Sequence, residues 1–319
     1  GPLLGHVTQM KITPIGSFIL IDFVRKAVYE YNASGDFVQQ IGLRGDKIGE
    51  YLLPVEIGGD SRDFVYVYDG GTRKLPVYNQ NRTLFSDWNP EKKYIFQRMI
   101  FYRENFGFQA VYDDRSGIPY ALLRKVNLKN NDEIFSIRLS KREEGNLVSY
   151  LGRRVGLCFS PILDRIFYLF PWQYHIFEMD TNTGLVISKF GIKPPNFRNV
   201  EEHFDKVGPE LGKAIRKGSL LAGMVLLNGK DLLVRYTMGQ VEKPPIGNVF
   251  CFFYQMSLGD GAISAIPVRD ASAIDWSKLI ASDGSLLYVY SPPDENDKDS
   301  NGTIKSYELS VKHVEPQGP

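Results

Sequence analysis

A short apolar strand recurs about every fifty residues along the chain, and this repeat constrains the fold more than any other feature. The copies are SFILID at 17–22, FVYVYD at 64–69 and FQAVYD at 108–113, followed by the looser RIFYLF at 165–170, LLVRYT at 232–237 and LLYVYS at 286–291. A strand repeat of this length is typical of a propeller or an array, in which neighbouring units bury faces that one unit cannot bury alone.

Each repeat divides into four short strands separated by turn residues. In the first repeat we expect strands over 7–12, 17–21, 26–31 and 37–41, and the Asn, Ser and Gly of the turn at 32–35 suit a hairpin. Four such strands make one blade. The second strands are apolar almost throughout, which predicts burial on both faces.

The same plan through the chain predicts an all-β fold, a six-bladed β-propeller of four-stranded antiparallel blades. We expect one domain over residues 3–316, with the two ends of the chain meeting near blade six or blade one. The fourth strand of the sixth repeat cannot be recognised in the sequence.

One stretch, NVEEHFDKVGPELGKAIRK at 199–217, has helical rather than strand periodicity. Its apolar residues are Val200, Phe204, Val207, Leu211 and Ile215. Asn199 could cap a helix, and Gly208-Pro209 should interrupt it. We therefore predict an insertion of one or two short helices at about 198–217, between blades four and five. It would cover the edge of the ring or one mouth of its channel.

Composition excludes some classes of function. The formal net charge is +1 without a basic stripe, which argues against nucleic-acid binding. No apolar run approaches the roughly 20 residues of a membrane span. Cys158 and Cys251 fall in strands of different blades, so we expect two buried free thiols rather than a disulfide. We expect a monomer.

The linker IGLRGDKIGEYLLPVEI at 41–57, with the segments on either side of it, resembles the NHL-type repeat of six-bladed propellers. The matching residues are Asp22 with Arg25, Gly35, Gly42, Gly45, Gly49, Glu50, Pro54, and Asp69 with Arg73. The resemblance covers about the first 80 residues, and the later repeats keep the strands but lose most of the motif. It is closest to bacterial propellers that are often exported or lipid-anchored and whose ligands are mostly unassigned.

The resemblance implies an exported protein, in the periplasm, at the cell surface or outside the cell, rather than a cytoplasmic one. No signal peptide is present, but Gly1-Pro2 is typical of the scar of an engineered protease site, so a native leader could have been cut off and its absence is weak evidence for the cytosol. The turn residues have two readings: each Asp pairs with its Arg or with turn amides, or the Arg side chains contact a ligand directly.

Propeller symmetry places the six turns between second and third strands on one face of the disc. We expect that face to carry Arg25, Arg73, Arg115, Trp172 and Tyr174. A mixture of arginine and aromatic side chains suits contact with a protein or a glycan. The alternative for Trp172 is packing over its own blade.

The segment DKDSNGTIKSYE at 297–308 matches the spacing of a calcium loop. Asp297, Asp299 and Asn301 could supply three oxygen ligands. Thr303–Leu309 reads as a strand, so Glu308 would point away from the loop. We expect weak calcium binding or an unliganded acidic hairpin, and no other cofactor.

The leading functional hypothesis is therefore a non-catalytic binding scaffold that uses one face of a propeller to bind a protein or a glycan. The alternative is a hydrolase or lyase with a metal site in the central channel. The four histidines lack the spacing of a zinc site, and no G-x-S-x-G motif occurs. We expect the residues lining the channel to discriminate between the two.

Overall fold

The computed structural model describes most of the 319 residues. The described ranges are 2–60, 62–88, 95–102, 106–113, 120–128, 132–140, 144–151, 155–194, 197–200, 203, 205–237, 249–256, 263–267, 279–282, 286–291 and 302–308.

Five antiparallel sheets of four strands, here called blades 1 to 5, follow one another along the chain. Blade 1 contains β1 (Val7–Ile12), β2 (Phe18–Asp22), β3 (Ala27–Tyr31) and β4 (Phe37–Gln40). Blade 2 contains β7 (Pro54–Gly59), β8 (Val65–Asp69), β9 (Leu75–Tyr78) and β10 (Leu84–Trp88). Blade 3 contains β11 (Ile95–Tyr102), β12 (Phe106–Asp113), β13 (Tyr120–Asn127) and β14 (Glu133–Arg138). Blade 4 contains β15 (Gly156–Ser160), β16 (Arg165–Leu169), β17 (Ile176–Asp180) and β18 (Val186–Phe190). Blade 5 contains β19 (Leu220–Leu227), β20 (Asp231–Thr237), β21 (Val249–Met256) and β22 (Ile263–Pro267).

The remaining strands form two smaller sheets. The last sheet has three strands, β23 (Leu279–Ser282), β24 (Leu286–Ser291) and β25 (Thr303–Glu308). In the linker between blades 1 and 2, β5 (Leu43–Arg44) and β6 (Glu50–Tyr51) pair in parallel. The prediction of an all-β propeller with four-stranded antiparallel blades is confirmed. The structure gives five such blades where six were predicted, because the described residues of the last repeat form only three strands.

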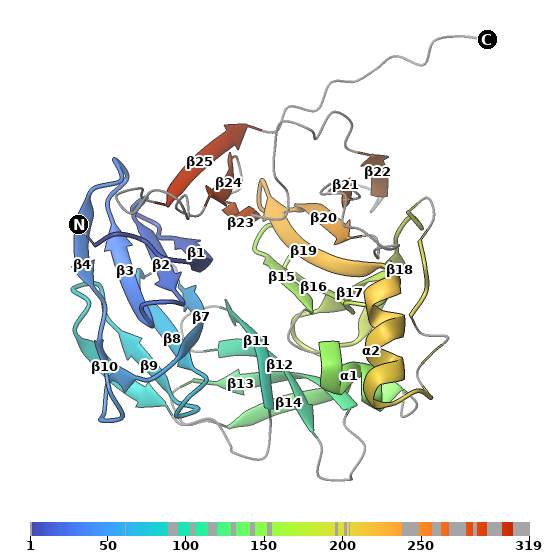
Figure 1. Cartoon of the computed structure of the whole chain (residues 1–319), viewed down its shortest axis with the longest axis horizontal. Helices are drawn as coiled ribbons and strands as arrows, with labels where there is room; N and C mark the ends of the chain where they lie inside the picture. Colours follow the sequence, from blue (N-terminus) through green and yellow to red (C-terminus); the bar gives the residue numbers. More distant parts are fainter. Residues whose placement is uncertain are drawn as a thin grey trace.

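The first strands of successive sheets contact one another around a common centre (Figure 1). Strand β1 lies against β7, β7 against β11, β11 against β15, β15 against β19, β19 against β23, and β23 against β1. The sheets at the two ends of the chain are therefore neighbours, as expected.

The second strand of each sheet is almost entirely buried, as its apolar sequence predicted. Ile19 and Ile21 of β2 share one core cluster with Val65 and Val67 of β8, so the cluster lies between blades 1 and 2. The fourth strands β4, β14 and β18 are largely exposed. The pattern follows from stacking, because a strand between two neighbouring blades meets a sheet on each side.

Glycine allows the linker after blade 1 to turn sharply. Gly42 has a φ of 68°, and a Cβ placed on it would lie 2.2 Å from the Tyr78 hydroxyl oxygen. Next to it, the Tyr51 hydroxyl donates to the Ile41 carbonyl at 2.7 Å. A larger residue at position 42 would therefore be strained by its backbone and would also clash.

Helix α2 (Gly208–Lys217) lies between β18 and β19 in chain order. Gly208-Pro209 begins this helix and does not interrupt it, because a proline in the first turn has no amide that needs a partner. The N-cap position of α2 is Val207, eight residues after Asn199, so the prediction that Asn199 caps this helix is wrong.

A second helix, α1 (Gly145–Leu151), lies between β14 and β15 and was not predicted. Leu147 and Val148 of α1 belong to the same core cluster as Leu211 of α2, and Figure 1 shows the two helices close together on one side of the ring. Neither helix has the length and apolar character needed to cross a bilayer.

Candidate binding face

In blades 1, 2 and 4, the turn that follows the second strand lies at the end of the blade where the preceding linker arrives. Asp22 at the end of β2 pairs with Val7 at the start of β1, and Asp69 at the end of β8 pairs with Pro54 at the start of β7. In blade 4, Leu169 likewise pairs with Gly156. This end of the blades forms the face on which the sequence placed its candidate residues.

Asp22 fixes the first of these turns. Its carboxylate is fully buried and accepts hydrogen bonds from the backbone amides of Gly5 at 2.7 Å, His6 at 3.3 Å and Arg25 at 3.1 Å. The carboxylate therefore joins the segment that enters blade 1 to the turn that leaves β2.

Asp69 repeats the arrangement in blade 2. Its carboxylate is fully buried and accepts from the amides of Leu52 at 3.1 Å and Leu53 at 2.6 Å in the linker, and from Gly71 and Thr72 in the turn. Burial alone would raise the pKa of Asp69, but the hydrogen bonds from Thr72 and the linker amides lower that pKa below its ordinary value. The two turns therefore share the geometry of a structural anchor.

The two described arginines of the face lie on these anchors. The Arg25 side chain is 42% exposed, its Nε lies 3.6 Å from the Asp22 carboxylate, and it donates to the Leu3 carbonyl. Arg73 is exposed, has a left-handed φ of 61°, and donates its amide to the Asp69 carbonyl at 2.8 Å. Arg25 therefore pairs with its own aspartate, and both side chains keep a solvent-facing surface.

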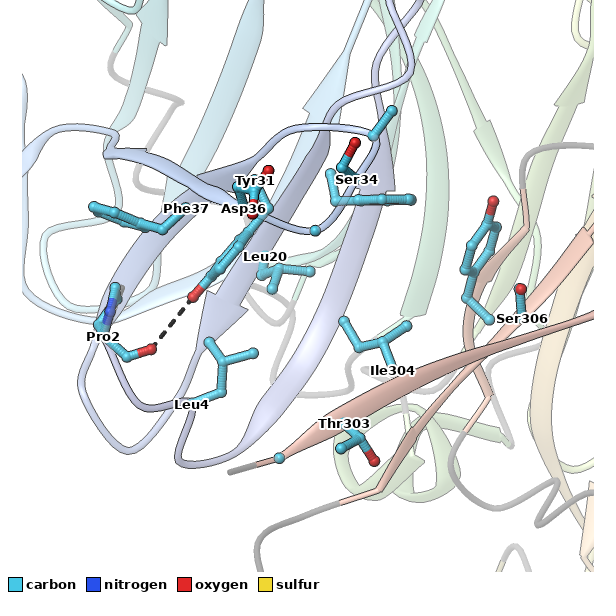
Figure 2. A pocket seen from close by; sticks show the side chains of 15 residues that line it. Pro2, Leu4, Leu20, Tyr31, Ser34, Asp36, Phe37, Thr303, Ile304 and Ser306 are labelled. Carbon is cyan, nitrogen blue, oxygen red and sulfur yellow. Dashed lines mark hydrogen bonds between the residues drawn. The ribbon is translucent and has the colours of Figure 1, made fainter. Parts of the chain in front are cut away.

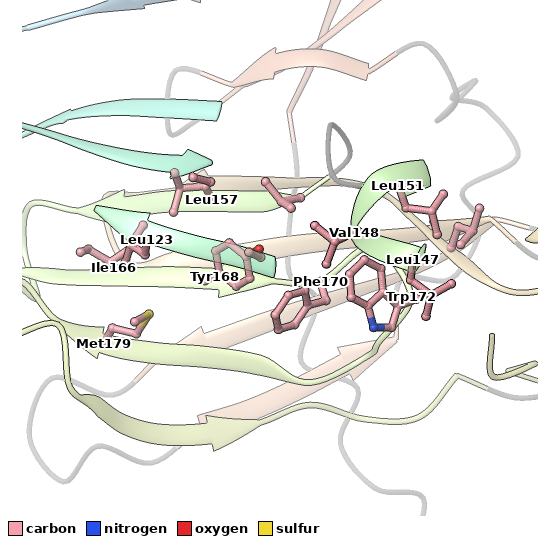
Figure 3. Close-up of a cluster of buried hydrophobic side chains, with 14 of the residues drawn as sticks. Leu123, Leu147, Val148, Leu151, Leu157, Ile166, Tyr168, Phe170, Trp172 and Met179 are labelled. Carbon is pink, nitrogen blue, oxygen red and sulfur yellow. The ribbon is translucent and has the colours of Figure 1, made fainter. Parts of the chain in front are cut away.

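Trp172 does not contribute to an exposed surface, because its side chain is only 1% exposed. It packs beside Phe170, at 4.9 Å between ring centroids, and against Leu147 and Val148 of α1 (Figure 3). Packing over its own blade was one of the two alternatives for Trp172 in the sequence analysis. The side chain packs there, under a helix that the sequence did not predict.

Tyr174 is half-buried and lies in the same turn. Its ring centroid is 4.1 Å from that of His175 and 5.3 Å from that of Phe197, and its carbonyl accepts from the Tyr236 hydroxyl at 3.2 Å. These contacts tie the turn of blade 4 to blade 5. The aromatic turn is therefore covered where α1 and α2 lie.

The other candidate residues, Arg115, Asp297, Asp299 and Asn301, lie outside the described residues. Within the described part of the chain, no three His, Cys, Asp or Glu side chains gather into a possible metal site.

The face has a second part, over blades 1 and 2, on which large apolar side chains are exposed. We call it the open face, and its residues are between 40% and 77% exposed: Leu3, Phe23, Val24, Leu43, Ile48 and Leu52. They lie in the segment before β1, in the β2–β3 turn and in the linker from β4 to β7. The sequence reasoning missed them, although Phe23-Val24 directly after a strand-ending aspartate is a signal, since a tight turn cannot bury them.

Polar side chains connect the first strands of blades 1 to 3. The Gln9 amide donates to the Glu56 carboxylate at 2.9 Å, and Arg98 Nε lies 3.5 Å from the same oxygen. Arg98 also donates to the Val155 carbonyl at 3.2 Å. Burial raises the pKa of Glu56, and Arg98 partly opposes this. The innermost strands thus carry charged as well as apolar side chains.

No protein family matches this chain, and no curated protein matches it in sequence. Solved structures with a similar fold include a Bacteroides fragilis protein whose name describes it as exported, at a TM-score of 0.65 and 13% identity, covering 91% of this chain and 80% of that one. A DUF4221 family member from Bacteroides vulgatus matches at 0.60 and 10%, over 96% and 94% of the two chains. A virginiamycin B lyase from Staphylococcus aureus matches at 0.51 and 11%, over 88% and 76%.

Proposed function

We propose that this chain is a non-catalytic binding protein that holds a protein ligand on the open face of a six-bladed, NHL-type propeller. In this proposal the three-stranded last sheet is the sixth blade. The observation that carries it is that six large apolar side chains are exposed in the entry segment, the β2–β3 turn and the linker of blades 1 and 2.

Exposed apolar side chains that gather on one surface are typical of an interaction site. Here they sit on backbone that is held firmly, because Asp22 and Asp69 anchor the turns beneath them. Arg25 and Arg73 lie on the same turns, and arginine is enriched in protein interfaces. Aliphatic side chains such as Val24 and Ile48 favour a protein over a glycan as the ligand.

A buried ion-pair cluster joins blades 1 and 2 at the end of the blades opposite the open face, and it fixes the two blades relative to each other. Arg82 lies 2.7 Å from the Glu30 carboxylate of β3 and 3.0 Å from the Asp63 carboxylate of the β7–β8 turn. A pre-organised surface loses little conformational entropy when a partner binds.

We propose an exported location, which the name of the Bacteroides fragilis protein with this fold supports.

The test is site-specific photo-crosslinking in cells of the source organism, with a photo-reactive residue at Val24 or Ile48. The matched control is Ile162, which is 55% exposed but lies in the β15–β16 turn at the opposite end of its blade. We expect one discrete protein adduct from Val24 and Ile48, none from Ile162, and at least about tenfold less adduct at position 48 when Val24→Asp is added. Equal adducts from all three positions, or none, would reject the open face as the binding site.

A hydrolase or lyase acting at the centre of the ring is the second candidate. The observation in its favour is Glu56, whose pKa is raised by burial while Arg98 lies beside it, since perturbed carboxyl groups often do acid–base work. Turnover of a panel of ester and lactone substrates that disappears in Glu56→Gln, with an unchanged melting temperature, would favour this candidate over the binding protein.

A further inference from the structure

A cavity of about 630 Å³ lies at the seam between blade 1 and the last sheet (Figure 2). One side is formed by β2, β3 and the β3–β4 turn, and the other by β24 and β25. Its volume falls in the range of small-molecule sites. None of its lining residues belongs to the open face, although Pro2 and Leu4 flank Leu3, and a ligand in the cavity does not depend on the proposed function.

Aromatic rings form much of the cavity wall. Phe18 of β2 and Tyr288 of β24 meet across the seam, with ring centroids 5.6 Å apart and planes at 63°. Tyr31 and Phe37 meet at 5.7 Å and 71° on the blade 1 side, where Figure 2 shows them close to Asp36. The steep angle within each pair is a favourable arrangement of aromatic rings, and all four rings line the cavity.

The described lining of the cavity carries negative charge and no positive charge. Among the described residues that line the cavity, Asp36 is the only charged side chain, and there is no lysine, arginine or histidine. One carboxylate oxygen of Asp36 accepts from the Asn32 side-chain amide at 3.1 Å. Burial, the largest cause, raises the pKa of Tyr31 to about 12, so this phenol is neutral at physiological pH.

Backbone amides of the β3–β4 turn already donate hydrogen bonds within the turn. Asn32 accepts from the backbone amides of Ser34 at 3.0 Å and Asp36 at 2.8 Å through its side-chain oxygen, and from Gly35 through its carbonyl. An anionic ligand would therefore find no cation in the described lining, only the hydroxyl groups of residues such as Ser34, Thr303 and Ser306. A cationic ligand, in contrast, would find a carboxylate and several aromatic rings, and cations are attracted both to ring faces and to negative charge.

We propose that this seam cavity binds an organic cation, an alkylammonium or quaternary ammonium group, with its charge toward Asp36 and its apolar body against the rings. The aromatic wall provides apolar contact and cation–π attraction, and Asp36 selects for positive charge. A neutral ligand of the same shape would gain only the apolar contact.

The experiment is a calorimetric titration of the whole chain with choline and with its neutral carbon isostere, 3,3-dimethylbutan-1-ol. We expect choline to bind at least about tenfold more tightly than the isostere, which corresponds to a desolvated cation–π interaction. Asp36→Asn should weaken choline binding by about threefold to fivefold. Phe37→Leu should weaken choline more than it weakens the isostere.

The matched control is Asp205→Asn, which makes the same change of net charge at an exposed residue of the linker between β18 and β19. It should leave choline binding unchanged. Because Asp36 is exposed, its variant should fold, and the melting temperature of each protein checks this. No measurable choline binding, equal affinity for the isostere, or an equal loss in Asp205→Asn would overturn the proposal.

Discussion

Replacing Asp69 by alanine should destabilise the whole ring, because one carboxylate joins the linker from blade 1 to the turn of blade 2. The carboxylate is fully buried and accepts from the amides of Leu52 and Leu53 on one side and of Gly71 and Thr72 on the other. The Thr72 hydroxyl donates a fifth hydrogen bond at 2.6 Å. Alanine removes the carboxylate acceptor, so these five donors lose their protein partner and depend on water for a hydrogen bond.

The expected loss follows from the number and burial of the donors. A hydrogen bond to a charged group contributes about 1.5 to 3 kcal/mol, and such contributions do not add fully when they share one acceptor. The turn is near the surface, so water can reach some of the freed amides. We therefore expect the free energy of unfolding to fall by about 3 to 5 kcal/mol, measured by urea denaturation.

Asp180 provides the matched control. Its carboxylate accepts from the amides of Asn182 and Thr183 and from the Thr183 hydroxyl, all within its own turn, and its ion pair with Arg165 at 3.8 Å stays within blade 4, so it joins no linker to the turn. Asp180→Ala should therefore cost far less than Asp69→Ala. Similar losses in the two variants would refute the idea that Asp69 acts by joining linker and turn.

The same anchor predicts a dependence on pH. The pKa of Asp69 is lowered in the folded protein, so the unfolded chain binds its proton more readily. The stability from this carboxylate is fully present above about pH 4, the unfolded pKa, and is lost as the pH falls through the lower folded value. The difference in unfolding free energy between wild type and Asp69→Asn should therefore shrink in acid, and a constant difference would contradict this.

Three further expectations concern the ring. Deleting residues 1–12 removes β1, which lies against both β7 and β23, so the melting temperature of the whole domain should fall, and no change would argue against closure. Arg82→Met leaves the Glu30 carboxylate buried without its cation and should cost about 3 to 5 kcal/mol in urea denaturation, partly recovered by adding Glu30→Leu. In a Cys251→Ser variant, Cys158 should react with a maleimide only after unfolding, as followed by mass spectrometry. It is buried, and burial raises the pKa of its thiol to about 11.

The sequence was most informative where the structure is periodic and local. The second strands could be predicted because burial between two blades requires an unbroken apolar run, which is visible without any partner. The turn aspartates could be predicted for a similar reason. Asp22 and Asp69 each bind amides close to them in the turn, and the linkers they hold recur at a fixed place in the repeat.

The helices show where local reading fails. Helix α1 has seven residues, too short for periodicity to distinguish it from a loop, and it is stabilised by packing on Trp172. The expected interruption at Gly208-Pro209 is instead the start of α2, because proline is tolerated in the first turn of a helix. Val200 precedes this helix and is buried in the same cluster as Leu211, which accounts for its apolar character.

The candidate face depends on the same non-local packing. Symmetry gives each blade an equivalent turn, and the turns of blades 1 and 4 both follow a buried strand. They differ in what covers them: α1 lies over Trp172, whereas Phe23 and Val24 of the blade 1 turn remain exposed. A turn residue is therefore available to a ligand only where no neighbouring segment covers it. Among the described turns of this face, those of blades 1 and 2 are uncovered. The aromatic side chains of the blade 4 turn pack into the hydrophobic core instead.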